Sequence, residues 1–311
     1  MSARFSRALK GEGNINNQLK ARFGPAGSAD SFAQMGYKKT EQMPEYLTQM
    51  GLNAFEYQCG RGVRVNATMA EKFARLAQAA DIAVSVHAPY YISLSSVETE
   101  KRRKSVDYIL QSARAVKLLG GSRIVVHTGS CAKISREEAL ALACEAMGWA
   151  LDALDAEGLS DVRICPEVMG KINQLGTLEE VVALCQLDER MLPCVDFGHL
   201  NARTFGGLKG FEDYRRVFDT IENALGNARL KELHAHFSKI EYTENGGEKR
   251  HLTFEDTVFG PDFMPLAELI AQRSCHPTII CESAGTQAED AQWMRARYDE
   301  ILKNADAGER L

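Results

Sequence analysis

The chain lacks several features that would each mark a class of protein. No apolar stretch approaches the roughly 20 residues that a membrane-spanning helix needs. The opening residues, MSARFSRALKGEG, contain no apolar core of a secretory signal, so we expect a cytoplasmic protein. Positive charge is not in excess, with 37 Lys and Arg against 42 Asp and Glu in 311 residues. Any contact with nucleic acid would therefore need a local basic face.

Paired cysteines and a glycine fingerprint are also missing. The eight cysteines are scattered, and no two of them form a CxxC pair. Several lie inside apolar runs such as RICPEV and PCVDFG, and we interpret them as buried, reduced thiols of a cytosolic protein. No GxGxxG follows the first apolar segment, so a doubly wound open sheet has no support from that motif.

What the chain does contain is a recurring strand pattern. Eight short segments are rich in apolar residues, and most are continuously apolar, as strands buried on both faces are. The segments are 20–27, 53–58, 83–90, 122–129, 162–168, 192–199, 232–238 and 277–283. Amphipathic stretches typical of helices lie between them, including 68–81, 97–120 and 135–158. Ser135 and Glu138 have the spacing of a capping box at the start of the last of these.

Eight strand-then-helix units in a chain of this length predict an α/β fold of the TIM (β/α)8 barrel type. A doubly wound open sheet is the alternative. The sequence contains no linker or low-complexity segment, so we expect residues 1–311 to form one domain. The longest irregular stretch is 238–263, and a loop of that length in a compact domain is usually functional.

Histidines and acidic residues fall at or near the C-terminal ends of six consecutive predicted strands. They are His87, His127, Glu167, Asp196, His199, His234 and Glu282. In a TIM barrel these ends converge on one face, where active sites lie. Burying several charges together without a cation is costly, so the pattern predicts a divalent-metal site at that face. Imidazoles and carboxylates without a thiolate suit zinc or manganese in a catalytic site.

Three further histidines lie outside this group. His251 lies in the long stretch after the seventh strand. His236 is two residues after His234 and so faces the same side of that strand, and its role stays open. His276 precedes the eighth strand and so lies at the opposite end of the barrel, where we expect a structural role.

The segments HAPYYISLSS, VVHTGS, CPEV, CVDFGHLNA, LHAHFSK and CES occur in this order. Together they resemble endonuclease IV, the metal-dependent abasic-site endonuclease family within the xylose-isomerase-like TIM-barrel superfamily. The resemblance covers nearly the whole chain and implies a cluster of zinc ions, with manganese as a possible substitute. It implies one ion held by His87, His127 and Glu167, a second by Glu167, Asp196, His234 and Glu282, and a third by His199 and His251.

The resemblance also implies an activity and a partner. The protein would be a hydrolase of DNA base-excision repair that incises duplex DNA 5′ to an abasic site. Glu167 and Glu282 would be the catalytic carboxylates, acting beside metal ions that activate water and neutralise phosphate charge. The positions that would contact DNA are Tyr90, Tyr91, Arg61 and Arg64.

One departure from the family pattern bears on the number of ions. Lys249 stands where the family has the aspartate of an Asp-x-His motif, and a lysine there would repel a third ion. Glu248, one residue earlier, is the available substitute for that aspartate, so two or three ions remain open.

Two other functions remain open. A sugar isomerase or epimerase of the same superfamily would use Glu167, Asp196, His234 and Glu282 around one ion and would not require both His127 and His251. A non-catalytic DNA-binding relative is the third hypothesis.

Overall fold

The computed structural model describes residues 20–131 and 133–307, and within them eight parallel strands form the centre of the molecule. The strands are β1 (Arg22–Pro25), β2 (Ala54–Gln58), β3 (Ala83–His87), β4 (Arg123–Val126), β5 (Arg163–Pro166), β6 (Cys194–Asp196), β7 (His234–Phe237) and β10 (Thr278–Cys281). Backbone pairing joins them into two parallel sheets, β2-β3-β4-β5 and β1-β10-β7-β6. Isolated parallel bridges, Ala26 with Glu56 and Glu167 with Cys194, join the sheets at both edges. This closed arrangement confirms the predicted TIM barrel.

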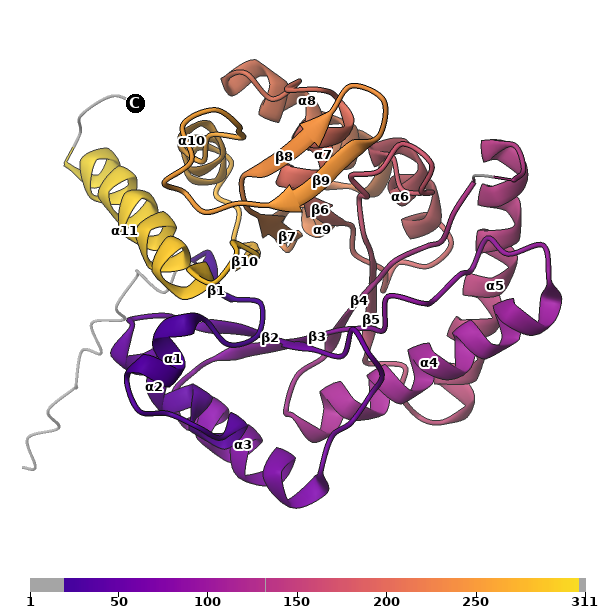
Figure 1. Ribbon diagram of the computed structural model, residues 1–311, viewed down its shortest axis with the longest axis horizontal. Helices are drawn as coiled ribbons and strands as arrows, with labels where there is room; N and C mark the ends of the chain where they lie inside the picture. Colours follow the sequence, from indigo (N-terminus) through magenta and orange to yellow (C-terminus); the bar gives the residue numbers. More distant parts are fainter. Residues whose placement is uncertain (1–19, 132, 308–311) are drawn as a thin grey trace, which may run out of the picture.

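Helices surround the strands and cover the outside of the barrel (Figure 1). They are α1 (Asp30–Gln34), α2 (Met43–Gln49), α3 (Ala67–Ala79), α4 (Thr99–Leu118), α5 (Arg136–Ala156), α6 (Leu178–Cys185), α7 (Phe197–Arg203), α8 (Phe211–Leu225), α9 (Asn227–Lys231), α10 (Met264–Gln272) and α11 (Gln287–Asp306), with a short 3-10 turn η1 (Thr40–Gln42). The helices α3, α4 and α5 lie where the amphipathic pattern predicts them. Ser135 caps α5, because its Oγ accepts the backbone N–H of Glu138 at 3.1 Å. In the described ranges, no helix has the length and apolar character needed to cross a membrane.

The stretch 238–263, expected to be irregular, contains an antiparallel hairpin of β8 (Ile240–Thr243) and β9 (Gly247–His251). Figure 1 shows this hairpin in orange beside α7, which it contacts. The sequence of β9, GEKRH, has no alternation of apolar and polar residues, so the periodicity that indicates a strand is absent. Positive φ at Gly247 (72°) helps the chain turn into β9.

The apolar core lies mainly between the strands and the helices. Phe237 of β7 faces outward and packs its ring against those of Phe197, Phe254 and Phe263 at centroid distances of 6.3, 5.8 and 5.3 Å. The interior of the barrel is different. A small apolar cluster of Val125, Cys165, Leu192 and Cys194 lies there. The same interior also contains buried polar side chains, namely Glu56, Ser85, His87, Glu167, Asp196, His234 and His236.

Candidate metal centre

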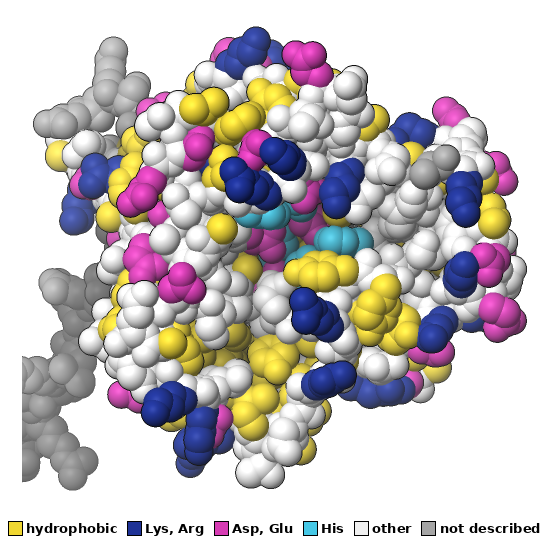
Figure 2. Space-filling view, viewed as in Figure 1, with side chains coloured by type: hydrophobic (Ala, Val, Ile, Leu, Met, Phe, Trp, Pro, Cys, Tyr) yellow, Lys and Arg dark blue, Asp and Glu magenta, His cyan; other side chains and the backbone are white. Residues whose placement is uncertain are grey.

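A cavity of about 600 Å³ opens at the C-terminal ends of the strands. The residues that line it are Ala26, Gln58, His87, Tyr90, His127, Glu167, Met169, Lys171, Gln174, His199, Glu248, His251, Glu282, Ser283 and Gln287. Figure 2 shows histidine and acidic side chains at the bottom of this hollow. The predicted convergence of these residue types on one face is therefore present in the structure.

Three side chains from neighbouring strands form the first set of potential ligands. His87 ends β3, and His127 and Glu167 lie just past the ends of β4 and β5. Glu167 Oε2 lies 3.3 Å from Nε2 of His87 and 3.0 Å from Nε2 of His127. Nδ1 of His87 lies 2.9 Å from the carbonyl oxygen of Ala88, which can only accept. The proton of a neutral His87 is therefore on Nδ1, and the lone pair of Nε2 faces Glu167.

The second set consists of Glu167, Asp196, His236 and Glu282, whose donor atoms lie within 4.8 Å of one another. Nδ1 of His236 is 3.1 Å from Oε1 of Glu167 and 3.6 Å from Oε2 of Glu282. Asp196 also caps α7, because its Oδ1 accepts the backbone N–H of His199 at 2.7 Å. This cap fixes the carboxylate and leaves Oδ2 directed at the set. Glu167 belongs to both sets and so links them.

The third set consists of His199, Glu248 and His251. Nε2 of His199 lies 3.5 Å from Oε2 of Glu248. Nδ1 of His199 donates to the carbonyl oxygen of Val168 at 3.1 Å, which leaves the lone pair of a neutral ring on Nε2. His251 is oriented by Ser238, whose Oγ is 2.9 Å from its Nδ1. Both histidines are therefore held in fixed orientations beside a carboxylate.

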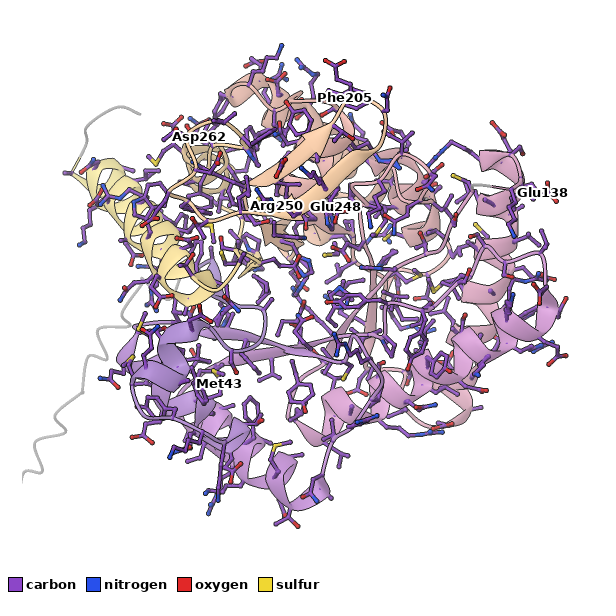
Figure 3. All side chains as sticks on the ribbon, in the orientation of Figure 1. Met43, Glu138, Phe205, Glu248, Arg250 and Asp262 are labelled. Carbon is purple, nitrogen blue, oxygen red and sulfur yellow. The ribbon has the colours of Figure 1, made fainter. Side chains whose placement is uncertain are left out.

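The hairpin brings Glu248 to this position and turns Lys249 away. The backbone N–H of Glu248 donates to the carbonyl oxygen of Gly170 at 3.1 Å. Lys249 instead bonds Glu241 on the neighbouring hairpin strand, with 2.5 Å between Nζ and Oε1, and its side chain is 54% exposed. Figure 3 labels Glu248 and Arg250 on this strand. Lys249 is therefore directed away from the third set, and Glu248 rather than Lys249 lies beside His199.

The structure brings His236, and not the expected His234, to Glu167 and Glu282. Strand register explains the difference, because Asp196 pairs with His236, whereas Cys194 pairs with His234 one level deeper in the barrel. His234 is fully buried and places its Nε2 3.0 Å from Oε2 of Glu56. The motif LHAH offers two histidines on one face, and only the register with neighbouring strands tells which lies nearer the opening.

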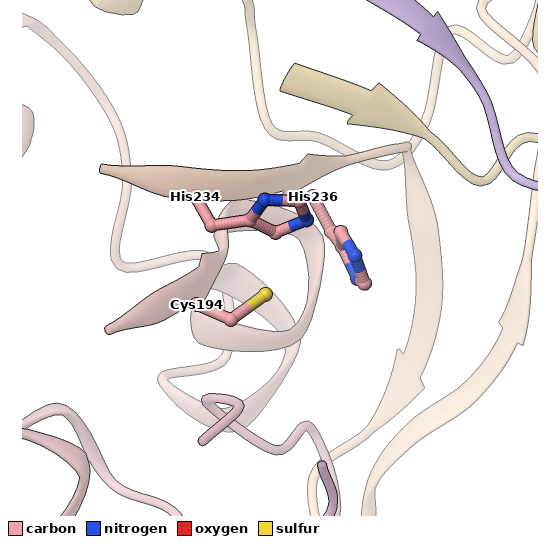
Figure 4. A group of neighbouring side chains, drawn as sticks. All are labelled: Cys194, His234 and His236. Atoms are coloured by element: carbon pink, nitrogen blue, oxygen red, sulfur yellow. The ribbon is translucent and has the colours of Figure 1, made fainter. Parts of the chain in front are cut away.

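Cys194, His234 and His236 form a deeper group with donor atoms within 4.8 Å of one another (Figure 4). Burial raises the pKa of the Cys194 thiol well above its usual range, so the thiol stays protonated rather than forming the thiolate that binds metals. Nε2 of His234 is already bonded to Glu56. We therefore interpret this deeper group as a support for the three sets above it.

The pKa values of His87 and His199 are shifted in the opposite direction from that of His234. Burial opposes charge on His87, but the Glu167 carboxylate beside it raises the pKa to about 9. Burial also opposes charge on His199, and Asp196 with Glu167 raises that pKa to about 10. For His234, burial dominates and lowers the pKa to about 4. Without a bound ion, His87 and His199 thus carry protons that compensate the buried carboxylates.

Of the four residues expected to contact DNA, Tyr90 lines the cavity. Tyr90 is 55% exposed, and its ring centroid lies 5.2 Å from that of His87 and 5.4 Å from that of His127. Tyr91 is 50% exposed and packs edge-on against Tyr108 at 4.7 Å. The two expected arginines line an adjacent hollow that Tyr90 also lines. The basic residues that line the two hollows are Arg61, Arg64 and Lys171.

Fold and site together define a class: a (β/α)8 barrel that gathers histidines and carboxylates at the C-terminal ends of its strands. The chain belongs to the xylose isomerase-like TIM barrel family, whose sequence model matches residues 44–297. An uncharacterized protein of Methanocaldococcus jannaschii is 31% identical over 287 residues, which are 92% of this chain and 100% of that relative. A probable endonuclease 4 of Acholeplasma laidlawii is 30% identical over 163 residues, a match that spans 51% of this chain and 53% of that relative.

Solved structures with the same fold include two kinds of enzyme. Endonuclease IV from Thermus thermophilus superposes with a TM-score of 0.66 at 20% identity, covering 91% of this chain and 99% of that one. A D-tagatose 3-epimerase-like protein superposes with a TM-score of 0.68 at 17% identity, covering 92% and 99%. At such identities the likeness shows the fold alone. The predicted resemblance is confirmed at the level of the family: the chain is a divergent member of the xylose isomerase-like TIM barrel family and shares partial matches with endonuclease 4 proteins.

Proposed function

We propose that this protein is a metal-dependent phosphodiesterase of the endonuclease IV type, which incises duplex DNA 5′ to abasic sites. The third set, His199 with Glu248 and His251, carries this proposal. A sugar isomerase that works with one ion requires the second set but has no use for two further histidine–carboxylate sets around it. Partial matches to probable endonuclease 4 proteins support the same assignment.

The residues present fit divalent ions. Glu167 Oε2 and Asp196 Oδ2 are buried, and in the described part of the chain neither has a hydrogen-bond partner. Nε2 of His127 nevertheless lies 3.0 Å from Glu167 Oε2. Buried oxygens and nitrogens that lie this close without hydrogen bonds fit coordination of a shared cation. Imidazoles and carboxylates at the opening favour zinc or manganese, and we propose two or three ions.

Bound divalent ions would supply a water activated near neutral pH and would neutralise charge on the phosphate oxygens. The chain's own residues then have separate tasks. Glu167, shared by the first two sets, holds them at a fixed spacing. Glu282 is 14% exposed at its side chain, the most accessible carboxylate of its set, and lines the cavity where a water would attack. It can orient that water and accept its proton.

DNA would bind across the opening of the cavity and the adjacent hollow. Arg61, Arg64 and Lys171, which line the two hollows, would supply the local positive face that the net charge of −5 does not provide overall. Tyr90, half exposed above the first set, is placed to stack against an exposed base or to fill the gap at an abasic site. Lys171 lines the cavity itself and is placed to contact a backbone phosphate.

The test is incision of a duplex oligonucleotide that carries one stable abasic analogue, at low salt, with zinc or manganese supplied. We expect cleavage 5′ to the lesion, lost in Glu282→Gln, which keeps the size of the side chain but removes its charge. Glu71→Gln, an exposed position on α3, is the matched control and should cleave normally. Cleavage by Glu282→Gln at the unchanged rate would contradict the assigned role, and absence of cleavage by metal-loaded protein would contradict the proposed activity.

A sugar isomerase or epimerase is the second candidate, because one observation favours it. A cavity of about 600 Å³ is within the usual size range of small-molecule sites. Glu167 and Glu282 would then exchange protons with carbons beside a carbonyl group. Turnover of ketoses, with one ion bound per chain, would support this candidate, whereas two or more tightly bound ions would argue against it. Bound metal without turnover of either substrate class would point to a non-catalytic relative.

A further inference from the structure

A hollow of about 370 Å³, the N-terminal hollow, opens where the strands of the barrel begin, at the end opposite the metal centre. Arg22, Arg123 and Thr278, which begin β1, β4 and β10, all line it. Its other polar lining includes Lys20, Glu232 and His276. None of these residues belongs to the three sets of potential metal ligands.

A layer of apolar side chains separates this hollow from the metal centre. Side chains at alternate positions of a strand face the same side, so Arg123 faces the barrel interior together with Val125 and His127. Val125 belongs to the buried apolar cluster inside the barrel. The hollow is therefore a separate site and not an extension of the cavity at the other end.

Arg123 has little to compensate its charge. Within residues 20–131 and 133–307, its guanidinium makes no ion pair, and its one hydrogen bond is long, from Nη1 to Oγ1 of Thr278 at 3.4 Å. This contact takes the side chain from β4 across the base of the barrel to β10. Burial lowers the pKa of Arg123, as expected for a cation withdrawn from water. A guanidinium has five N–H donors, so several remain available to a ligand in the hollow.

The other charges around the hollow leave a positive excess. Glu232 is the one carboxylate in its described lining, and Arg163 already pairs with it. Arg22 pairs with the exposed Asp81, with 2.9 Å between Nη2 and Oδ1. Lys20 is exposed and, in the part of the chain that the structure describes, forms no ion pair. The positive charge of Lys20 and Arg123 is thus unmatched, although the protein as a whole has a net charge of −5.

These donors suit a phosphate group. A guanidinium presents parallel N–H groups that match two oxygens of a phosphate, and an ammonium adds a point charge. The His276 ring has no hydrogen bond or ion pair within the described ranges, so its N–H is available to a further oxygen. A volume of about 370 Å³ lies at the lower end of the range for small-molecule sites. The hollow therefore has room for an organic group attached to the phosphate.

We propose that the N-terminal hollow binds a small phosphate-bearing anion, with Arg123 as the main contact and Lys20 and His276 as further donors. Because the potential metal ligands lie at the other end of the barrel, this anion is an effector or stabilising ligand and not the substrate. The inference goes beyond the proposed function and holds for either reaction at the metal centre.

Arginine side-chain signals test the inference locally. Full-length, metal-loaded protein labelled with ¹⁵N-arginine would be titrated with inorganic phosphate and, separately, with glycerol phosphate, at constant ionic strength set by chloride. We expect a saturable shift of the Nε–H signals of Arg123 and of Arg22, which lines the same hollow. Loss of one signal in Arg123→Lys identifies the first. Phosphate bound at the metal centre would not produce this shift, because the apolar cluster lies between the two sites.

The Arg22 signal then measures affinity in variants. Arg123→Gln should weaken phosphate binding about 10- to 100-fold, as loss of a charged hydrogen-bonding partner usually does. Lys20→Ala should weaken it about 2- to 5-fold, because this lysine is exposed. Lys72→Ala removes an equally exposed lysine from α3, away from the hollow, and should leave the affinity unchanged.

Each outcome bears on the proposal. Tighter binding of glycerol phosphate supports an organic phosphate, and tighter binding of inorganic phosphate supports the free ion. No saturable shift with either at millimolar concentrations overturns the inference, as does unchanged affinity in Arg123→Gln. If Arg123→Gln does not fold, unchanged affinity in both Lys20→Ala and His276→Ala overturns it instead. A shift caused by duplex DNA but by neither small phosphate overturns it in favour of a nucleic-acid surface.

Discussion

Gly170 and Glu248 approach so closely that a Cβ atom on residue 170 would lie 2.6 Å from the Cβ atom of Glu248. It would also lie 2.9 Å from Cδ2 of His199. The loop after β5 and the hairpin strand β9 can therefore carry the third set only because residue 170 has no side chain. The position of the hairpin and the composition of the site are thus coupled through one glycine.

Gly170→Ala should move the hairpin away from the barrel. We expect a loss of about 1–3 kcal/mol in the free energy of unfolding, as overpacking of tight sites usually costs, and weaker binding at the third set. Denaturant unfolding and metal titration measure the two effects. Gly148→Ala, in the middle of α5 where an added Cβ meets nothing within 4 Å, should be neutral or stabilising by up to about 1 kcal/mol. Tolerance of alanine at 170 with full metal binding would contradict this account.

Glu248→Gln should weaken one ion at least about tenfold, because the third set loses its carboxylate. Lys249→Ala, one residue further along β9, should leave the ion count and the affinities unchanged, since Lys249 is exposed and pairs with Glu241. Metal analysis after dialysis and chelator competition compare the two variants. Equal effects of the two substitutions would mean that the hairpin orientation differs from that described.

Metal affinity should rise with pH. In the ion-free protein, burial opposes charge on His87 and His199, but neighbouring carboxylates raise their pKa values from 6.5 to about 9 and about 10. Since an ion binds only the deprotonated nitrogen, protons compete with it below these values. Dissociation constants measured across the range from neutral pH to the higher of these pKa values should therefore fall as pH rises, with protons released on binding. An affinity independent of pH would argue against these two histidines as ligands.

The same shifts predict the stability of the ion-free fold. Histidines with raised pKa values bind more protons folded than unfolded, so their contribution is complete below a pH of 6.5 and is lost as pH rises through pKa values of about 9 and about 10. Ion-free protein should therefore be less stable in denaturant unfolding at the upper end of this range than near neutral pH. Zinc-loaded protein should show a smaller decline, because the ion replaces those protons.

Tyr90→Ala should weaken binding of abasic duplex about 5- to 100-fold, through loss of stacking. Tyr90→Phe should bind normally, because burial raises the pKa of this hydroxyl to about 12 and the neutral ring is what stacks. Tyr91→Ala should have a smaller effect, since the Tyr91 ring packs against Tyr108. Fluorescence anisotropy with labelled duplex at constant low salt measures all three.

Much of this architecture follows from the sequence because the signals are local. Continuous apolar segments of β-branched residues mark the buried strands, and amphipathic spacing marks helices such as α4 and α5. His87, His127 and Glu167 lie at the ends of three of those strands, so the barrel topology alone brings them together.

What the sequence could not provide depends on register and on long-range contact. The choice between His234 and His236 requires the pairing of β7 with β6, which no local pattern encodes. Glu248 reaches the site through a polar hairpin that lacks strand periodicity. Glu56 sits in an apolar strand with no motif around it, and only its contacts across the barrel show its relation to His234.

The closure of the barrel has a mechanical consequence. The two four-stranded sheets meet at edges where isolated bridges replace full ladders. Glu167 extends from one sheet, whereas Asp196, His236 and Glu282 extend from the other. An ion held by the second set would therefore act as a cross-link between two halves that share little backbone pairing. Loss of this ion would then reduce both the rigidity of the barrel and the order of the catalytic site, and rebinding of the ion would restore both.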